Sequence, residues 1–131
     1  MIALDTNVLV RFLVEDDAAQ AERAKAFLQR AIDSKEPCYV SDVVLCELVW
    51  VLERSYKLRR REVCKGLSRL VYAQHLVFSS VEGLSRALEA YEKTRGDFAD
   101  YIIREHARAK GCEAVATFEK ALLKEPGFMA L

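Results

Sequence analysis

The chain has 131 residues, of which 52% are hydrophobic and 31% charged, a composition that fits one globular domain with a real core. Its 20 basic and 20 acidic residues cancel, which excludes an overall positive field and confines any nucleic-acid site to a local surface. Four cysteines without CxxC spacing indicate reduced thiols in the cytoplasm, and no apolar stretch approaches the roughly 20 residues that span a membrane.

The amino-terminal stretch predicts a strand, a turn and a helix. Residues Ile2–Leu4 are apolar without alternation, which is typical of a strand buried on both faces in a parallel sheet. Asp5, Thr6 and Asn7 follow, and such side chains favour the start of a helix. Asp5 is therefore predicted at the carboxyl end of a central strand, where open α/β sheets hold their ligands. The alternative is that Asp5 only caps the helix.

The rest of the chain alternates helical patterns with short apolar runs. Helices are predicted over 8–14, 18–32, 42–56, from 59 to about 71, from a cap at Ser79 to about 95, and over 97–110. Strands are predicted over 38–40, 75–78 and 113–118, with a short edge strand at 126–131. Such alternation implies one domain over 1–131 with a parallel sheet covered by helices on both faces.

Glu47 interrupts an otherwise apolar helix. Residues Val43–Leu52 are apolar at every other position, and a helix that is apolar all round is buried. An unpaired buried carboxylate is costly, whereas a bound cation or a fixed basic partner removes that cost. Glu47 is therefore a candidate metal ligand, and the alternative is a structural hydrogen bond or salt bridge.

Three further acids are predicted near element ends. Asp97 and Asp100 lie three residues apart in the first turn of one helix, where free N–H groups favour carboxylates. Asp97 as the N-cap and Asp100 at the third helical position is the plain structural alternative. Glu119 follows an apolar run, just beyond a predicted strand, and its alternative is a solvated acid at a helix start.

These acids fall at strand carboxyl ends, helix amino ends or inside a buried helix. In a parallel α/β sheet the first two places share one edge, so at least three carboxylates can converge there. Converging carboxylates repel one another unless hard cations such as Mg²⁺ or Mn²⁺ hold them. A site of this kind suits phosphoryl chemistry, because the metal activates water and neutralises phosphate oxygens.

Four motifs together resemble the PIN-domain ribonucleases, and more narrowly their VapC toxin group. They are DTNVL at 5–9, SDVVLCELVWVL at 41–52, GDFADYIIREHARAKGC at 96–112 and VATFEK at 115–120. The resemblance covers essentially the whole chain. It implies an α/β/α sandwich with a mainly parallel sheet of about five strands, and Mg²⁺- or Mn²⁺-dependent endonuclease cleavage of RNA.

The resemblance also assigns residues and partners. Asp5, Glu47 and Asp100 match the metal-binding acids of the family, Asp97 matches an additional acid of the subgroup, and Glu119 stands where the family often has Asp. Thr6 and Asn7 match residues that brace the first acid. The resemblance further implies a homodimer held inactive by a small antitoxin protein whose carboxyl-terminal segment lies beside the metal site, in the cytoplasm and without a membrane.

Three rival functions remain open on the sequence. A phosphate-accepting receiver domain would need an acidic pair after the first strand, where this chain has Asp5-Thr6-Asn7. A dehalogenase-like phosphatase would need an Asp in place of Asn7. A catalytically silent binding module that keeps the PIN-like fold is the third, and Glu119 leaves it open.

Overall fold

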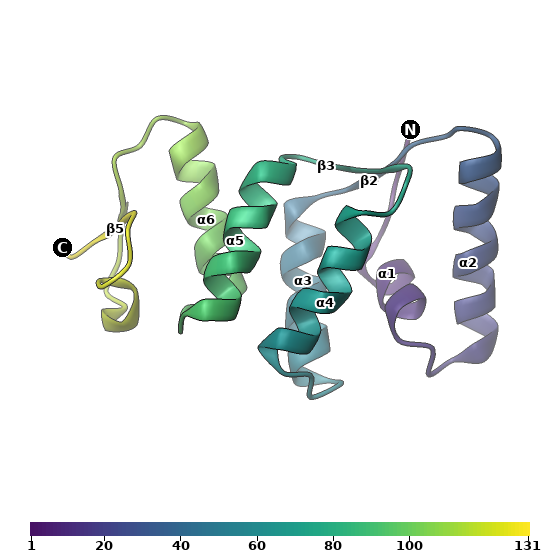
Figure 1. Cartoon of the computed structure of the whole chain (residues 1–131), viewed down its shortest axis with the longest axis horizontal. Coiled ribbons are helices and arrows are strands. Elements are labelled where there is room, and N and C mark those ends of the chain that lie inside the picture. Colours follow the sequence, from purple (N-terminus) through teal and green to yellow (C-terminus); the bar gives the residue numbers. More distant parts are fainter. The chain divides into compact units, whose positions relative to one another are not determined.

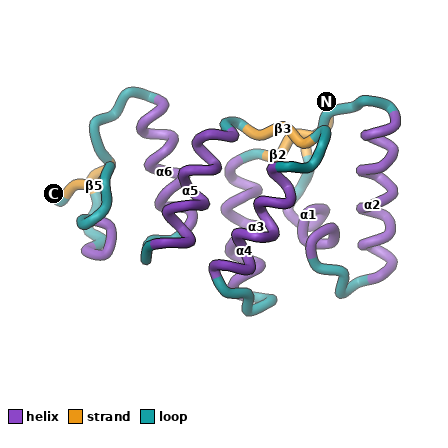
Figure 2. Tube along the Cα trace, in the orientation of Figure 1, coloured by secondary structure: helices purple, strands orange, loops and turns teal.

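A computed structural model describes all residues, 1–131, and every strand pairing in it is parallel. The chain forms six α-helices and five short strands, with two helices between successive strands from β1 to β4. Figures 1 and 2 show their arrangement. The strands form a three-stranded sheet, β1-β2-β3, and a separate two-stranded sheet, β4-β5. The prediction of an α/β fold with parallel strands is therefore confirmed. The chain divides into two compact units, Met1–Ser79 and Ser80–Leu131, here called unit 1 and unit 2.

Unit 1 holds the three-stranded sheet and four helices. Its elements are β1 (Ile2–Ala3), α1 (Thr6–Leu13), α2 (Ala18–Asp33), β2 (Cys38–Val40), α3 (Asp42–Arg54), α4 (Arg60–Val71) and β3 (Leu76–Phe78). Helix α1 packs against both α2 and α3, and α3 packs against α4. Side chains of α1, α3 and α4 form the core of this unit, and the largest fully buried ones among them are Leu9, Leu45, Leu48, Leu52, Leu67 and Leu70.

The first strand differs from its prediction. Strand β1 has two residues and lies at one end of the β1-β2-β3 order, so one edge of it has no partner strand in this sheet. Ile2 is 44% exposed, and only Leu4, which follows the strand, is buried. The expectation of a strand buried on both faces is therefore wrong for β1. An apolar run without alternation does not by itself say whether both faces are covered.

Helix α3 is amphipathic, which the apolar sequence around Glu47 concealed. Its buried side faces the core through Leu45, Leu48, Val49 and Leu52. Val43 is 69% exposed and Trp50 57% exposed. The prediction of a helix buried all round is wrong, because apolar residues on the open side leave no periodic signal in the sequence.

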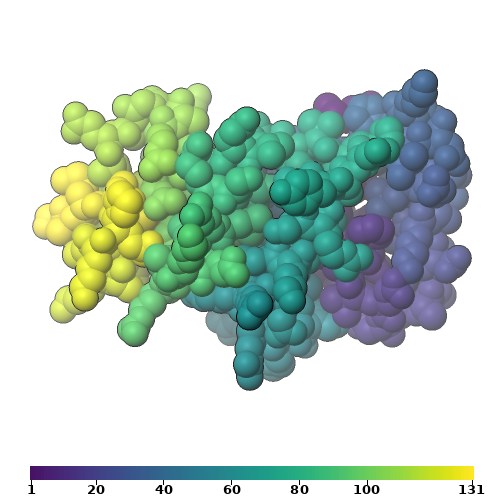
Figure 3. Space-filling model, in the orientation of Figure 1, coloured from purple at the N-terminus to yellow at the C-terminus, as the bar shows by residue number.

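Unit 2 holds the remaining elements. They are α5 (Val81–Lys93), α6 (Phe98–Ala109), β4 (Val115–Ala116), the 3₁₀ turn η1 (Lys120–Leu122) and β5 (Phe128–Met129). Helices α5 and α6 pack side by side and bury Leu84, Tyr91, Phe98 and Tyr101 between and beside them. The residues after β5 lie at the surface, where the yellow atoms of the space-filling view mark them (Figure 3), and Leu131 is 77% exposed.

Two boundaries in unit 2 correct the sequence prediction. Ser80, and not Ser79, caps α5, since its Oγ accepts a hydrogen bond from Gly83 N–H at 3.0 Å, whereas Ser79 Oγ lies 2.8 Å from Tyr39 Oη within unit 1. Strand β4 covers two residues in place of 113–118, because β5 offers a parallel partner over that length only.

Candidate metal site

Asp5 stands at the amino end of α1 with its carboxylate unused. It occupies the N-cap position, yet its side chain makes no capping hydrogen bond. The side chain is exposed, and the structure gives it no ion pair. Capping therefore does not account for the residue, although the position is that of a cap. A free carboxylate at a helix amino end is available to a ligand.

Glu47 is held near Asp5 through a neighbouring hydroxyl. Thr6 Oγ1 donates a hydrogen bond to Glu47 Oε2 over 2.7 Å, which joins the start of α1 to the middle of α3. Thr6 is only 5% exposed, so its hydroxyl is fixed in place. The expectation that Thr6 braces the first acid is wrong in its target: the residue braces Glu47.

The surroundings of Glu47 also correct the prediction. The side chain is exposed, and Val43 and Trp50, four residues before it and three after it, are exposed on the same side of the helix. Glu47 is therefore not the buried carboxylate that its apolar sequence neighbours predicted. No basic side chain pairs with Glu47, and its Oε1 is left open. Of the two structural alternatives, the hydrogen bond is therefore confirmed, with Thr6 as its donor, and the salt bridge is not.

In unit 2, Asp97 and Asp100 take the capping arrangement that their spacing predicts. Asp97 is the N-cap of α6, Asp100 is its third residue, and together they form a capping box. Asp100 Oδ2 accepts a hydrogen bond from Asp97 N–H at 2.9 Å. The structural role is thus confirmed for the pair, and it uses one oxygen of Asp100 while Oδ1 remains open.

Partial burial raises the pKa of Asp100 above its ordinary value, and the hydrogen bond from Asp97 N–H opposes this effect. The negative charges of Asp97, Glu119 and Glu125 raise the pKa of Asp100 further. These carboxylates of unit 2 therefore lie close enough to Asp100 for the negative charge of each to raise its pKa. A nearby cation would relieve this repulsion.

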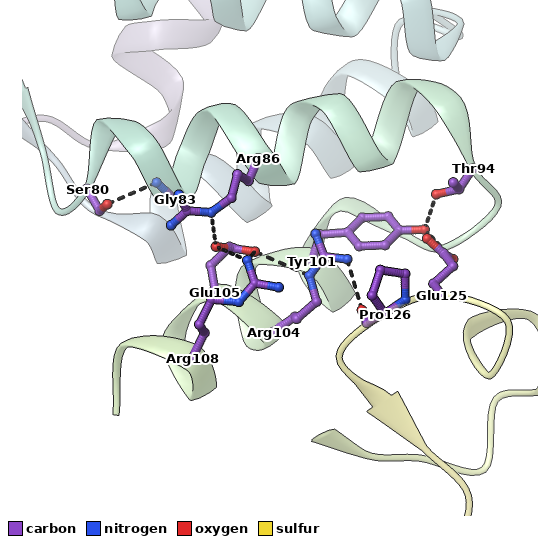
Figure 4. A network of polar contacts seen from close by, with 10 residues as sticks. All are labelled: Ser80, Gly83, Arg86, Thr94, Tyr101, Arg104, Glu105, Arg108, Glu125 and Pro126. Carbon is purple, nitrogen blue, oxygen red and sulfur yellow. Dashed lines mark hydrogen bonds and ion pairs between the residues drawn. The ribbon is translucent and has the colours of Figure 1, made fainter. Parts of the chain in front are cut away.

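Glu119 and Glu125 flank the turn η1. Glu119 is exposed, and its N–H donates to Thr117 Oγ1 at 3.0 Å. Glu125 Oε2 accepts from the buried Tyr101 hydroxyl at 2.8 Å (Figure 4). Glu125 lies outside the four sequence motifs, between VATFEK and the predicted edge strand at 126–131, so no pattern in the sequence marks it.

The structure thus places the predicted acids in two groups, one in each unit. Asp5 and Glu47 are linked in unit 1, and Asp97, Asp100 and Glu119 interact in unit 2. No group of three or more His, Cys, Asp or Glu side chains is arranged in the structure to hold a metal ion. None of the four cysteines forms a disulfide in the structure.

A cavity of about 500 Å³ opens beside Asp5 between α1 and α2. Leu4 and Asn7, close to Asp5 in the chain, line it together with apolar residues of α2. Arg23 and Arg30 of α2 also line it and are exposed with no charged partner. The cavity therefore combines an apolar lining with positive charge.

Comparison with known proteins places the chain in a family. Residues 2–127 match the PIN domain. The chain is also 26% identical over 124 residues to a VapC ribonuclease of Aquifex aeolicus (strain VF5), an alignment that covers 95% of this chain and 91% of that protein. No helix has the length and apolar character needed to cross a membrane. The match over almost its full length, with the parallel α/β fold and the two groups of acids, shows that this chain belongs to the PIN-domain family.

Proposed function

We propose that the chain is the toxin of a toxin–antitoxin pair, an endoribonuclease that hydrolyses RNA with Mg²⁺ or Mn²⁺. The proposal treats residues 1–131 as one PIN domain and assigns metal binding to Asp5, Glu47 and Asp100, with help from Asp97 and Glu119. PIN-family membership and the similarity to a VapC ribonuclease support this reading. They also disfavour the receiver-domain and phosphatase alternatives.

The observation that carries the proposal is the hydrogen bond between Thr6 Oγ1 and Glu47 Oε2. Thr6 is bonded to Asp5 in the chain, so a fixed Thr6–Glu47 contact keeps two acids from distant stretches within one small region. Neither acid has a basic partner there. Two unpaired carboxylates held as neighbours have a physical reason to bind a cation.

The donor set fits a hard divalent ion. Asp5 has both carboxylate oxygens open, Glu47 has Oε1 open and Asp100 has Oδ1 open. Oxygen ligands without His or Cys suit Mg²⁺ or Mn²⁺ better than zinc. The raised pKa of Asp100 agrees with a carboxylate whose charge needs a cation to balance it.

A divalent ion bound there would lower the pKa of a water and offset the charge of the phosphate oxygens. The protein's own part is to hold the carboxylates in place. Thr6 fixes the orientation of Glu47, the Asp97 N–H fixes one oxygen of Asp100, and the exposed Asp5 and Glu47 leave the site open to a long substrate.

The test is RNA cleavage by the purified chain with Mn²⁺, with Mg²⁺ and with EDTA. We expect metal-dependent endonucleolytic products, and their loss in Asp5→Asn. Asp33→Asn is the matched control, since Asp33 lies at the exposed end of α2 and its bond from Gln29 survives in the amide. Cleavage by folded Asp5→Asn at the rate of the control would refute the assignment.

A silent binding module is the second candidate, because Glu119 replaces the usual Asp. Metal binding and cleavage separate the two. Mn²⁺ at 100 times its dissociation constant should stabilise an active site by about 2.7 kcal/mol, and Asp5→Asn should abolish the shift. A metal-induced shift without cleavage of any RNA would favour the silent module.

The partners belong to the same proposal. We place the carboxyl-terminal segment of a small antitoxin in the cavity between α1 and α2, because it adjoins Asp5 and carries unpaired positive charge. The proposal also includes a homodimer and a location in the cytoplasm, and the four free thiols support the cytoplasmic location. Loss of antitoxin binding in Arg23→Glu with unchanged basal cleavage would support this placement, and unchanged binding would refute it.

A further inference from the structure

Unit 2 contains an arginine cluster that the metal site does not use. At its centre Glu105 of α6 has a side chain only 4% exposed. Its Oε1 accepts from Arg86 Nε of α5 at 2.6 Å, and its Oε2 accepts from Arg104 Nε at 3.2 Å and from Arg108 Nη1 at 3.3 Å (Figure 4). Three guanidinium groups thus surround one carboxylate.

Of the three arginines, only Arg104 is buried and used in packing within unit 2. Arg104 is 7% exposed, donates from Nη1 to Pro126 O at 3.3 Å and stacks on the rings of Tyr101 and Phe128. It therefore ties α6 to the segment before β5. Its guanidinium is enclosed, so Arg104 is not available to contact a phosphate.

Arg86 and Arg108 are different. Their side chains are 50% and 48% exposed, and Glu105 binds Arg86 through Nε and Arg108 through Nη1. Each keeps further N–H donors open to solvent, since a guanidinium carries five. A buried carboxylate that orients two half-exposed arginines leaves a positive surplus, because a single arginine would suffice to neutralise Glu105.

We propose that Arg86 and Arg108, oriented by Glu105, form a clamp for a backbone phosphate of the RNA substrate. Arginine forks bind phosphate oxygens in pairs, and arginines already held in place lose less side-chain entropy on binding. The inference rests on the proposed ribonuclease function and extends it to the path of the RNA.

The position of the clamp along α6 suits this role. Arg108 follows Asp100 by eight residues, which is about 12 Å along a helix. A strand of a B-form duplex rises roughly 3.4 Å along the helix axis per nucleotide, so a stacked strand that runs along α6 covers this distance in about three or four nucleotides. A strand whose scissile phosphate lies at Asp100 would therefore reach the clamp within a few nucleotides.

The test measures RNA binding without cleavage. A short fluorescein-labelled oligouridine is titrated by anisotropy in EDTA at several salt concentrations, with wild type, Arg86→Gln, Arg108→Gln and the double variant. Lys65→Gln on α4 is the matched control, because Lys65 is exposed and has no charged partner. Each single variant should reduce the slope of log K against log salt by about 0.7, and the double variant by about 1.4.

The outcomes separate this inference from the proposed function. A melting curve checks that each variant is folded. If the double variant does not fold, the two single variants provide the test, because in each of them two arginines still neutralise Glu105. Equal slopes for all proteins, with RNA still cleaved by wild type, overturn the clamp and leave the ribonuclease standing. A wild type that neither binds nor cleaves RNA overturns both. Unchanged RNA slopes with weakened binding of labelled polyglutamate overturn the RNA assignment in favour of an acidic protein partner.

Discussion

Replacing Thr6 by Val tests whether the Thr6–Glu47 contact organises the site. Valine has nearly the same shape as threonine and lacks only the hydroxyl, so the buried position, 5% exposed, stays filled. The change removes the 2.7 Å hydrogen bond to Glu47 Oε2 and nothing else that the structure shows. Thr6→Ser restores the hydroxyl and is the matched control.

The expected cost to stability is small. A hydrogen bond to a charged group contributes roughly 1.5–3 kcal/mol, but the Glu47 carboxylate is exposed and water can replace the lost donor, so about 1 kcal/mol is expected. For a chain of this size that is a fall in melting temperature of about 3–6 °C. The functional cost should be larger, about 10- to 100-fold in metal affinity or cleavage, because Glu47 loses the group that orients it.

Two assays on the same protein distinguish these effects. Urea unfolding gives the change in free energy, and Mn²⁺-dependent RNA cleavage gives the change in activity and in the metal concentration needed. Thr6→Ser should recover the metal dependence and the cleavage, while the loss of the buried methyl group keeps its free energy of unfolding below that of wild type. Wild-type metal dependence and cleavage in folded Thr6→Val would refute the reasoning, since the bond would then have no part in placing Glu47.

Three further predictions concern unit 2 and the thiols. The pKa of Asp100 is raised in the folded chain, so its charged carboxylate destabilises the fold once the pH rises above the ordinary pKa of Asp. Asp100→Asn should therefore increase the free energy of unfolding at pH 7. Urea titrations without metal should show that this increase vanishes near pH 3. Gly127 has φ +91° and a side chain there would overlap Arg104, so Gly127→Ala should cost more than the roughly 1–2 kcal/mol expected for Gly111→Ala, where φ is +82° and the space is open; equal costs would refute the overlap. Burial raises the pKa of Cys46 to about 11, so iodoacetamide at pH 8 should modify the exposed Cys112 well before Cys46, as mass spectrometry would show; the reverse order would contradict this.

The sequence predicted local structure well where a local rule governs it. Strand β2 was predicted over Cys38–Val40 without error, and the capping role of Asp97 and Asp100 follows from their spacing. The start of α2 after Asp17 is likewise a matter of one side chain, which accepts from Gln20 N–H at 3.0 Å. Such features depend on residues within one turn of each other.

Two predictions that depended on neighbours from elsewhere in the chain were wrong. Glu47 was expected to be buried because every residue around it is apolar, yet the side of α3 that carries it is open. Thr6 was expected to support Asp5, its neighbour in sequence, and instead binds Glu47, which lies 41 residues away. No pattern in either stretch contains this information.

By itself, then, the sequence determined the alternation of strands and helices, the parallel class of the fold and the identity of the acids available for chemistry, since periodicity and residue type are local properties. Only the tertiary structure decided which carboxylates remain open, that Thr6 orients Glu47, and that Arg104 is enclosed while Arg86 and Arg108 stay accessible around Glu105. The reason is physical: the exposure and the hydrogen-bond partners of a side chain depend on how elements distant in the chain pack against one another, and no single segment determines that packing.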